Sequence, residues 1–179
     1  EILAKLGLQE VINYSFISKE AIKMLGITEP VLEITNPISD DMVIMRPTLI
    51  YSLLTNIRDN LNRNQNGLKF FEVSRVFTPK EDGLANETLR ASIALAGKSF
   101  KTLWNPKPEA MDFYTIKGFV EKFLEYMGVN RYQLDRSEDI NFHPGRSADI
   151  RIGKVKIGTF GEIHPELAEN MDIKRERTY

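Results

Sequence analysis

The chain has 179 residues, with 24 Lys and Arg against 25 Asp and Glu, which gives a formal net charge of −1. This balance provides no general attraction to nucleic acid or anionic membrane, so any such contact would need a local patch. The absence of cysteine excludes disulfides, thiolate nucleophiles and cysteine-ligated metals, and no apolar run approaches the roughly 20 residues that cross a bilayer. With 42% hydrophobic residues, the chain is long enough to bury a full core.

The first part of the chain predicts short elements. A helical tail over residues 2–6 ends at Gly7, a β-branched and aromatic strand covers 11–16, and Ser18 caps a helix that stops at Gly26. A second strand covers 31–35, where apolar and polar residues alternate. The first residues, EILAKLGLQE, lack an initiating Met and begin within a helical pattern, so we expect a piece of a longer protein.

The stretch 36–77 predicts the centre of the fold. Pro47 suits the first turn of a helix, and apolar residues then recur at helical spacing, at 49, 53, 54, 57 and 61. Ile50 and Tyr51 fall beside that stripe, which leaves open whether this helix is ordinary core or also packs against a partner helix. Residues 68–77 predict a central strand with both faces covered, because Phe70 and Phe71 point to opposite sides.

The second half predicts a loop over 79–87, a strand over 89–96, a loop carrying Trp104, and a helix from the cap Asp112 to Gly128. Trp104 is interpreted as a packing anchor rather than a stacking platform. Strands follow over 131–135, 147–152 and 155–160, then a helix over 165–170. We therefore expect one α+β domain over 1–179, an antiparallel sheet flanked by helices.

Two histidines, His143 and His164, are each followed by proline. Histidine suits acid–base chemistry and metal binding near neutral pH, so a paired site is one interpretation. A metal site needs three or four ligands, however, and neither local sequence supplies them. Because His-Pro-Gly is itself a turn signal, a structural turn is favoured over catalysis for both.

Other polar residues are tested against known catalytic and ligand-binding motifs. Ser147 and Asp149 near His143 suggest a hydrolytic triad, but the chain has no G-x-S-x-G elbow. It also has no phosphate-binding loop, and the segment 158–161 (GTFG) fits a strand without a ligand. Two basic neighbourhoods could touch RNA phosphates, although scattered basic residues usually form a solvated face. They comprise Arg58, Arg63, Lys69, Arg75 and Lys80, and Lys174, Arg175 and Arg177.

Four stretches together resemble the β subunit of bacterial phenylalanyl-tRNA synthetase, in the same order and over essentially the whole chain. They are ITNPISDDMVIMRPTLIYSLLTNIRDNLNRNQ, FFEVSRVF, the segment from Trp104 to MDFYTIKG, and FHPGRSADI with GKVKIGTFGEIHPEL. The resemblance is to the catalytic-like module near the C-terminal end of that subunit. It implies a fold related to class II aminoacyl-tRNA synthetases, with about six antiparallel strands.

The resemblance also implies partners and cofactors. In this family two α and two β chains form a heterotetramer, and the α subunit activates phenylalanine with ATP and transfers it to tRNA(Phe) in the cytoplasm. ATP and magnesium belong to the whole enzyme, so no cofactor is expected in this domain. The magnesium-binding and editing sites of the family lie outside it. The module itself is implied to be a scaffold packed against the α subunit.

The residues argue against catalysis by this chain. An active class II site holds its triphosphate with arginines, one of them from an R-x-E motif in a strand. Here Phe70 stands at the place of that arginine, followed by Glu72, and the late glycine segment has no arginine before Arg175. No catalytic or metal residue is therefore expected.

Two sets of residues are assigned instead. The motif residues of a pseudo-active face are Glu72, His143, Pro144, Gly145, Arg146 and His164, and the candidates for the subunit interface are Ile50, Tyr51, Leu54, Arg58 and Leu61. Two alternative functions remain open, a self-sufficient ATP-dependent acyl-adenylate ligase and a stand-alone RNA-binding module.

Overall fold

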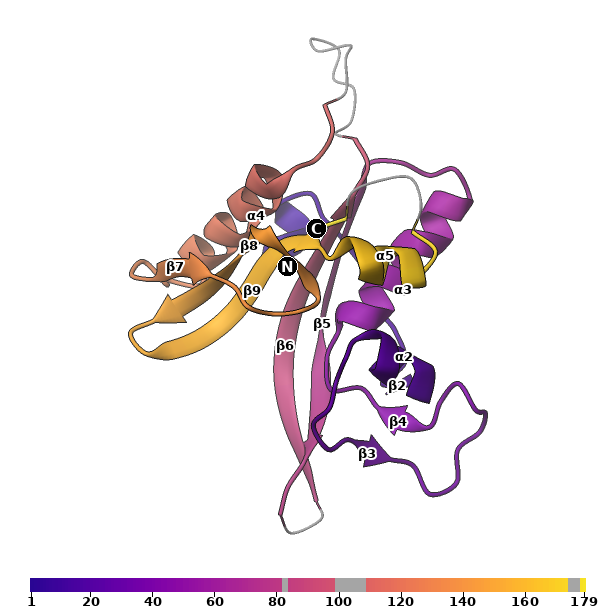
Figure 1. Ribbon diagram of the computed structural model, residues 1–179. Helices are drawn as coiled ribbons and strands as arrows, with labels where there is room; N and C mark the ends of the chain where they lie inside the picture. The colour runs from indigo at the N-terminus through magenta and orange to yellow at the C-terminus, as the bar shows by residue number, and fades with distance from the viewer. Residues whose placement is uncertain (82–83, 99–108, 174–177) are drawn as a thin grey trace.

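The computed structural model describes residues 1–81, 84–98, 109–173 and 178–179 (Figure 1). Its helices are α1 (Ile2–Lys5), α2 (Lys19–Met24), α3 (Ile50–Asn62), α4 (Phe113–Tyr126) and α5 (Pro165–Asn170). Its strands are β1 (Gln9–Glu10), β2 (Phe16–Ile17), β3 (Leu32–Glu33), β4 (Ile44–Met45), β5 (Leu68–Pro79), β6 (Ala85–Ala96), β7 (Gln133–Arg136), β8 (Phe142–Ile152) and β9 (Val155–Ile163).

The described strands form three three-stranded sheets, in the orders β1-β5-β6, β2-β4-β3 and β7-β8-β9. The long hairpin of β5 and β6 pairs without a register shift from Leu68 opposite Ala96 to Pro79 opposite Ala85. β5 is the central strand of its sheet, as predicted, and β1 pairs with it in parallel. All other strand pairs are antiparallel, so the expected α+β class with a flanked antiparallel sheet is confirmed.

Residues 178–179 connect two of these sheets. The amide of Leu95 in β6 donates to the carbonyl oxygen of Tyr179 (2.8 Å), and the amide of Tyr179 donates back (2.9 Å). On the other side, the amide of Ile163 in β9 donates to the carbonyl oxygen of Thr178 (2.8 Å). This short segment therefore lies between β6 and β9, and the implied single sheet is continuous only through it.

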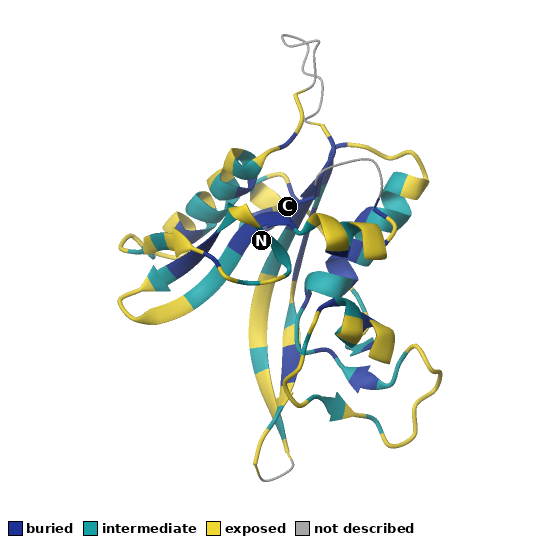
Figure 2. Cartoon of the chain, viewed as in Figure 1, coloured by how far each residue is buried: buried dark blue, intermediate teal, exposed yellow. Residues whose placement is uncertain are grey.

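The helices cover opposite faces of the central sheet (Figure 1). On one face α3 and α5 pack on a cluster that includes Phe70, Ala94 and Ile163, and on the other α4 packs on Phe71, Leu95 and Phe160. This follows from the pleat, because neighbouring residues of a strand point to opposite sides. Figure 2 shows that the upper part of β6 is buried while its lower part is exposed.

Coverage of β5 on both faces is interrupted in the middle of the strand. Val73 and Arg75, which share the α4 side of the sheet, lie beyond the helix and are exposed. The hairpin is long enough to project past the layer of helices. The expectation of a strand covered on both sides is correct near Phe70 and Phe71 and again at the buried pair Val76 and Phe77, but not at Val73 and Arg75 between them.

Helix boundaries follow their capping residues. The Asp112 carboxylate accepts from the Thr115 amide (2.8 Å) and the Thr115 hydroxyl accepts from the Asp112 amide (3.2 Å), a reciprocal capping box that begins α4 as predicted. Helix α3 begins at Ile50 rather than in the turn after Pro47. Among the described helices, none combines the length and apolarity that a bilayer crossing requires.

Two local predictions are wrong, and a third is correct only in part. Residues 11–15 are not a strand, because the chain leaves β5 after β1 and turns toward the small β2-β4-β3 sheet. The strand expected over 31–35 shrinks to β3. His143, Pro144 and Gly145 do not form a tight turn between elements but lie within β8, in a stretch where the pairing with β9 shifts register. Trp104 lies outside the described residues.

Candidate functional site

The strand position implied for a phosphate-binding arginine lies in the core. Phe70 is 5% exposed and packs under α3 with Leu53 and Leu54. Its ring points away from solvent, so this part of β5 provides no cation for a triphosphate. Two residues further, Glu72 points to the same side of the sheet and is also buried.

Glu72 forms a buried ion pair that the sequence analysis missed. Arg46 is fully buried, and its Nη2 lies 2.8 Å from Oε1 of Glu72, although outside the angles of a well-formed hydrogen bond. The other carboxylate oxygen accepts from the side-chain amide of Asn13 (2.8 Å). That amide also donates to Oδ1 of Asn56 on α3 (2.9 Å). The available sequence signal for this pair was that Arg46 and Glu72 each have apolar residues as immediate neighbours, in VIMRP and FFEV.

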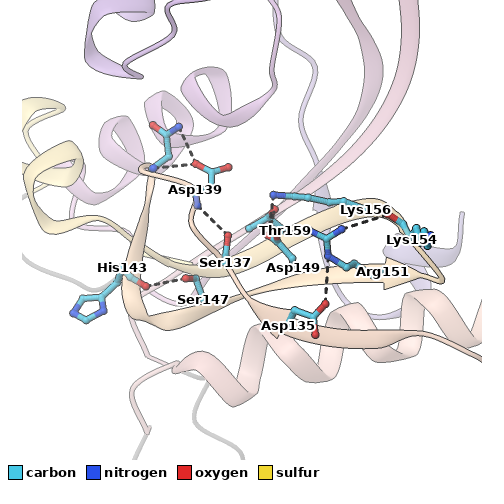
Figure 3. Close-up of polar contacts among 11 residues, drawn as sticks. Asp135, Ser137, Asp139, His143, Ser147, Asp149, Arg151, Lys154, Lys156 and Thr159 are labelled. Carbon is cyan, nitrogen blue, oxygen red and sulfur yellow. Dashed lines mark hydrogen bonds and ion pairs between the residues drawn. The ribbon is translucent and has the colours of Figure 1, made fainter.

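The HPGR motif is held by local contacts. Nδ1 of His143 accepts from the amide of Gly145 (3.0 Å), and the hydroxyl of Ser147 donates to the backbone carbonyl of His143 (2.9 Å; Figure 3). The hydroxyl therefore does not reach the imidazole, and the suggested triad is wrong. Arg146 instead pairs with Glu162 of β9, with 2.9 Å between Nη2 and Oε1. The hydrogen bond with Glu162 raises the pKa of Arg146, so the guanidinium stays charged.

Glu162 connects this motif to the segment that joins the sheets. It is 5% exposed, and the hydroxyl of Tyr179 donates to its Oε2 (3.2 Å). Gly161 beside it allows the close approach of β8, because a Cβ there would lie 2.5 Å from the carbonyl oxygen of Arg146. Gly161, the second glycine of the GTFG segment, therefore has a packing role, and the segment lies within β9, as predicted.

His164 has a structural role, as the sequence predicted. It is the N-cap of α5, and its Nδ1 accepts from the amide of Glu166 (3.3 Å). Pro165 then occupies the first turn, where its missing N–H costs nothing. In the described part of the chain, no group of His, Asp and Glu is arranged to hold a metal ion. Neither histidine is oriented toward a second acid–base group by a hydrogen bond within those residues.

Asp149 is the centre of a second polar cluster, on the face of β8 and β9 away from α4 (Figure 3). Nζ of Lys156 lies 2.8 Å from its Oδ1, and the hydroxyl of Thr159 donates to the same oxygen (2.9 Å). Burial by itself raises the pKa of Asp149, but hydrogen bonds from Lys156, Ser137 and Thr159 outweigh burial and hold the pKa below its ordinary value. The carboxylate is thus ionised, and its oxygens already bind neighbouring side chains of the same domain.

The five interface candidates on α3 separate by burial. Leu54 is 2% exposed inside the hydrophobic core, so it offers no surface in this chain. Ile50, Tyr51 and Leu61 are half-buried and pack against the same core, with Tyr51 also reaching the core of the small sheet. Arg58 is 31% exposed and pairs with its neighbour Asp59 (2.8 Å). The accessible side of α3 is therefore narrow and partly apolar.

The first basic neighbourhood is not a patch. Arg58 is paired with Asp59 on α3, on one face of the sheet. Lys69 lies over the ring of Phe119 from α4, on the other face, with 5.7 Å to the ring centroid. The structure therefore gives no support to a continuous basic surface there. The second neighbourhood, at Lys174, Arg175 and Arg177, lies outside the described residues.

A cavity of about 580 Å³ lies between β6 and β9. It is lined on one side by Ile50, Leu53 and Leu54 of α3 and on the other by side chains of α4 that include Phe123 and Leu124. Polar groups of Arg90, Ser92, Lys156 and Thr159 also reach it. Side chains from both helical layers enclose it.

Comparison with known proteins decides the family. The family described as "Phenylalanyl tRNA synthetase beta chain CLM domain" matches residues 1–179. The chain belongs to this family. A phenylalanine–tRNA ligase beta subunit from Fusobacterium nucleatum is 52% identical over 181 residues, covering 99% of this chain and 23% of that protein. One from Syntrophus aciditrophicus is 37% identical, covering 96% of this chain and 22% of that protein.

This CLM domain thus spans less than a quarter of the length of the relatives it matches. Among solved structures, a pyrrolysyl-tRNA synthetase from Desulfitobacterium hafniense superposes with a TM-score of 0.70 at 18% identity. That match covers 99% of this chain and 60% of the other. At such low identity the likeness concerns the fold alone, and it confirms the expected class II synthetase-like architecture.

Proposed function

We propose that this CLM domain is a non-catalytic module of a phenylalanine–tRNA ligase beta subunit, placed near its C-terminal end. It supports assembly with the α subunit in a cytoplasmic heterotetramer of two α and two β chains. The α subunit carries out the ATP- and magnesium-dependent attachment of phenylalanine to tRNA(Phe). No ATP, magnesium or other cofactor is assigned to this domain itself.

One observation carries the non-catalytic role. Phe70, at the position where a catalytic synthetase strand holds its arginine, is buried under α3. Glu72 is occupied by the Arg46 ion pair rather than facing a ligand. With an apolar residue at this position of β5, the fold can serve as a scaffold. It lacks the fixed cation that stabilises a reacting triphosphate.

Phenylalanine-dependent ATP–pyrophosphate exchange tests this role. The chain alone should give no exchange above the background without enzyme, whereas the complete α and β subunits together should give a clear rate. Exchange by the chain alone would show an autonomous adenylate-forming ligase and would overturn the proposal. Binding of tRNA by the chain alone, with affinity falling steeply as salt rises, would favour the RNA-binding alternative.

The accessible side of α3 is the proposed contact with the α subunit. It offers Tyr51 and Leu61 as half-buried apolar groups beside the partly exposed Arg58. A surface that mixes an aromatic residue, an aliphatic residue and arginine has the composition of an interface centre. Leu54 contributes by supporting these residues from the core.

Acidic substitutions on this surface test the contact with the α subunit. Arg58→Glu combined with Leu61→Glu should abolish co-purification with the α subunit, while the circular dichroism spectrum of the isolated chain stays unchanged. Tyr126→Glu is the matched control, because Tyr126 is 60% exposed on α4, across the sheet from α3. Retained co-purification by the double variant would show that α3 serves only the core of this domain.

A further inference from the structure

The connection between α3 and β5 contains the only Asn-Gly pair of the chain, Asn66 followed by Gly67. An asparagine loses its side-chain amide most readily before glycine, because glycine has no Cβ to keep its backbone nitrogen away from the asparagine Cγ. The connection leads into the end of the β5–β6 hairpin at which Leu68 pairs with Ala96 (Figure 1). The reactive pair therefore lies where two strands of the central sheet meet.

The side-chain oxygen of Asn66 is held between two backbone amides. Its Oδ1 accepts from the amide of Gly67 (2.7 Å) and from the amide of Lys98 (2.8 Å). The second bond crosses from the start of β5 to the end of β6, so Asn66 ties the two strands together beyond the last pair of their ladder. Two glycines make room for this oxygen, because Gly67 has a φ of +71° and a Cβ at Gly97 would overlap Oδ1. The oxygen is thus fixed in place, while Asn66 is exposed to water.

We propose that Asn66 is a site of spontaneous deamidation, and that the Lys98 amide directs the product to ordinary aspartate. The Gly67 amide loses its proton to solvent, and its nitrogen forms a bond to Cγ of Asn66. The electron pair of the carbonyl bond moves to Oδ1. It returns as the bond from Cγ to Nδ2 breaks, and the side-chain nitrogen takes a proton from water and leaves as ammonia. The result is a cyclic succinimide that joins the two residues.

The Lys98 amide acts on both steps of the reaction through the same oxygen. Negative charge develops on Oδ1 when the Gly67 nitrogen attacks, and an N–H that already lies 2.8 Å from that oxygen stabilises the charge. Water then opens the ring at one of its two carbonyl carbons. Attack at Cγ breaks the bond to the Gly67 nitrogen and leaves aspartate, whereas attack at the main-chain carbon leaves isoaspartate. Since the Lys98 amide polarises only the Cγ carbonyl, the fold favours aspartate.

Aspartate is also the product that fits the structure. A carboxylate oxygen at position 66 can accept from the same two amides, and hydrogen bonds to an ionised acceptor are the stronger kind. Isoaspartate would add one atom to the backbone just before Leu68, where β5 begins, and would disturb the register with β6. Deamidation would therefore add one negative charge at this end of the hairpin and leave the hairpin intact.

Peptide mass spectrometry of the aged chain tests the proposal. The folded chain and the chain unfolded in urea are incubated at mildly alkaline pH and cleaved with trypsin, which releases residues 64–69 as one peptide. Asn66 should lose its amide in both. The ratio of aspartate to isoaspartate should be about fivefold higher from the folded chain, which is what one net hydrogen bond contributes to a rate. Asn64 in the same peptide is the internal control, because it precedes Gln65 and should keep its amide.

Two variants at position 98 separate the hydrogen bond from general stability. Lys98→Pro removes the amide that binds Oδ1 and should lower the ratio to that of the unfolded chain, whereas Lys98→Ala keeps the amide and should leave the ratio unchanged. An equal ratio in the folded and unfolded parent chain would overturn the proposal, even where Lys98→Pro does not fold. Asn66 that stays intact in the folded chain while the unfolded chain deamidates would overturn it too. Neither outcome bears on α-subunit assembly, since the measurement follows one peptide of this chain.

Discussion

Glu72→Gln should destabilise the domain strongly, because it removes the charge that balances a wholly buried guanidinium. Arg46 has no exposed surface and Glu72 is 3% exposed, so solvent cannot compensate for the lost pairing. The remaining polar contact of the Arg46 side chain within the described residues is a long hydrogen bond from Nε to the carbonyl oxygen of Arg75 (3.4 Å). Breaking a buried pair from one side costs about 3–5 kcal/mol. With a urea dependence of about 2 kcal/mol per molar, the midpoint should fall by about 2 M.

Urea unfolding followed by far-ultraviolet circular dichroism measures this shift. Glu87→Gln is the matched control, because Glu87 pairs with Arg75 across the exposed part of the hairpin (3.1 Å) and its loss should cost less than about 1 kcal/mol. The double replacement Arg46→Met with Glu72→Leu should be far more stable than Glu72→Gln, since no unpaired charge is left in the core. If Glu72→Gln costs no more than Glu87→Gln, the ion pair does not hold this part of the fold.

Three further outcomes are expected. Lys156→Met should cost about 1 kcal/mol at pH 7, because the amine is partly exposed, and less at pH 3. The reason is that the pKa of Asp149 is lowered in the folded state, so its carboxylate stabilises the folded protein above its ordinary pKa of about 3.9. This stabilisation is lost as the pH falls through the folded pKa. An equal loss of stability at both pH values in urea unfolding would contradict this expectation. Asp112→Ala should remove the cap of α4 and cost about 1 kcal/mol, seen as a fall of about 2–4 °C in Tm, and an unchanged Tm would mean that the capping box contributes nothing. Phe70→Arg should lower the urea midpoint without creating ATP–pyrophosphate exchange, because the new charge would lie in the core under α3, and a stable variant with exchange activity would refute the scaffold assignment.

Periodic patterns made most of the fold predictable. The helix after Asp112 follows from apolar residues at helical spacing and from its cap, and both appear in the structure. The long strand at Phe70 follows from large residues on both of its faces. The stripe on α3 likewise predicted its buried side, since Leu53, Leu54 and Ile57 are in the core.

The polar contacts of the core were not predictable in the same way. Arg46 and Glu72 meet only because β4 and β5 come together in three dimensions, and a single sequence gives no measure of that distance. His143 and Pro144 carry a turn signal, but they lie within β8, in an irregular stretch between the pairs Phe142–Ile163 and Ser147–Gly161, so the strand pairing on either side overrides the local preference. Arg146 was placed correctly in a motif, yet its partner Glu162 was not identified. Local chemistry identifies candidate residues, whereas their partners depend on topology.

The bridge formed by Thr178 and Tyr179 has a consequence for the order of folding. The β5–β6 hairpin and the β8–β9 hairpin each form from residues close in sequence, so each can assemble early. Their union depends on contacts between Tyr179 and Leu95, which are far apart along the chain. During synthesis the two hairpins would therefore be made before the residues that join them, and each would expose an open edge in the interval. The domain should therefore behave as one cooperative folding unit only after that late contact has formed.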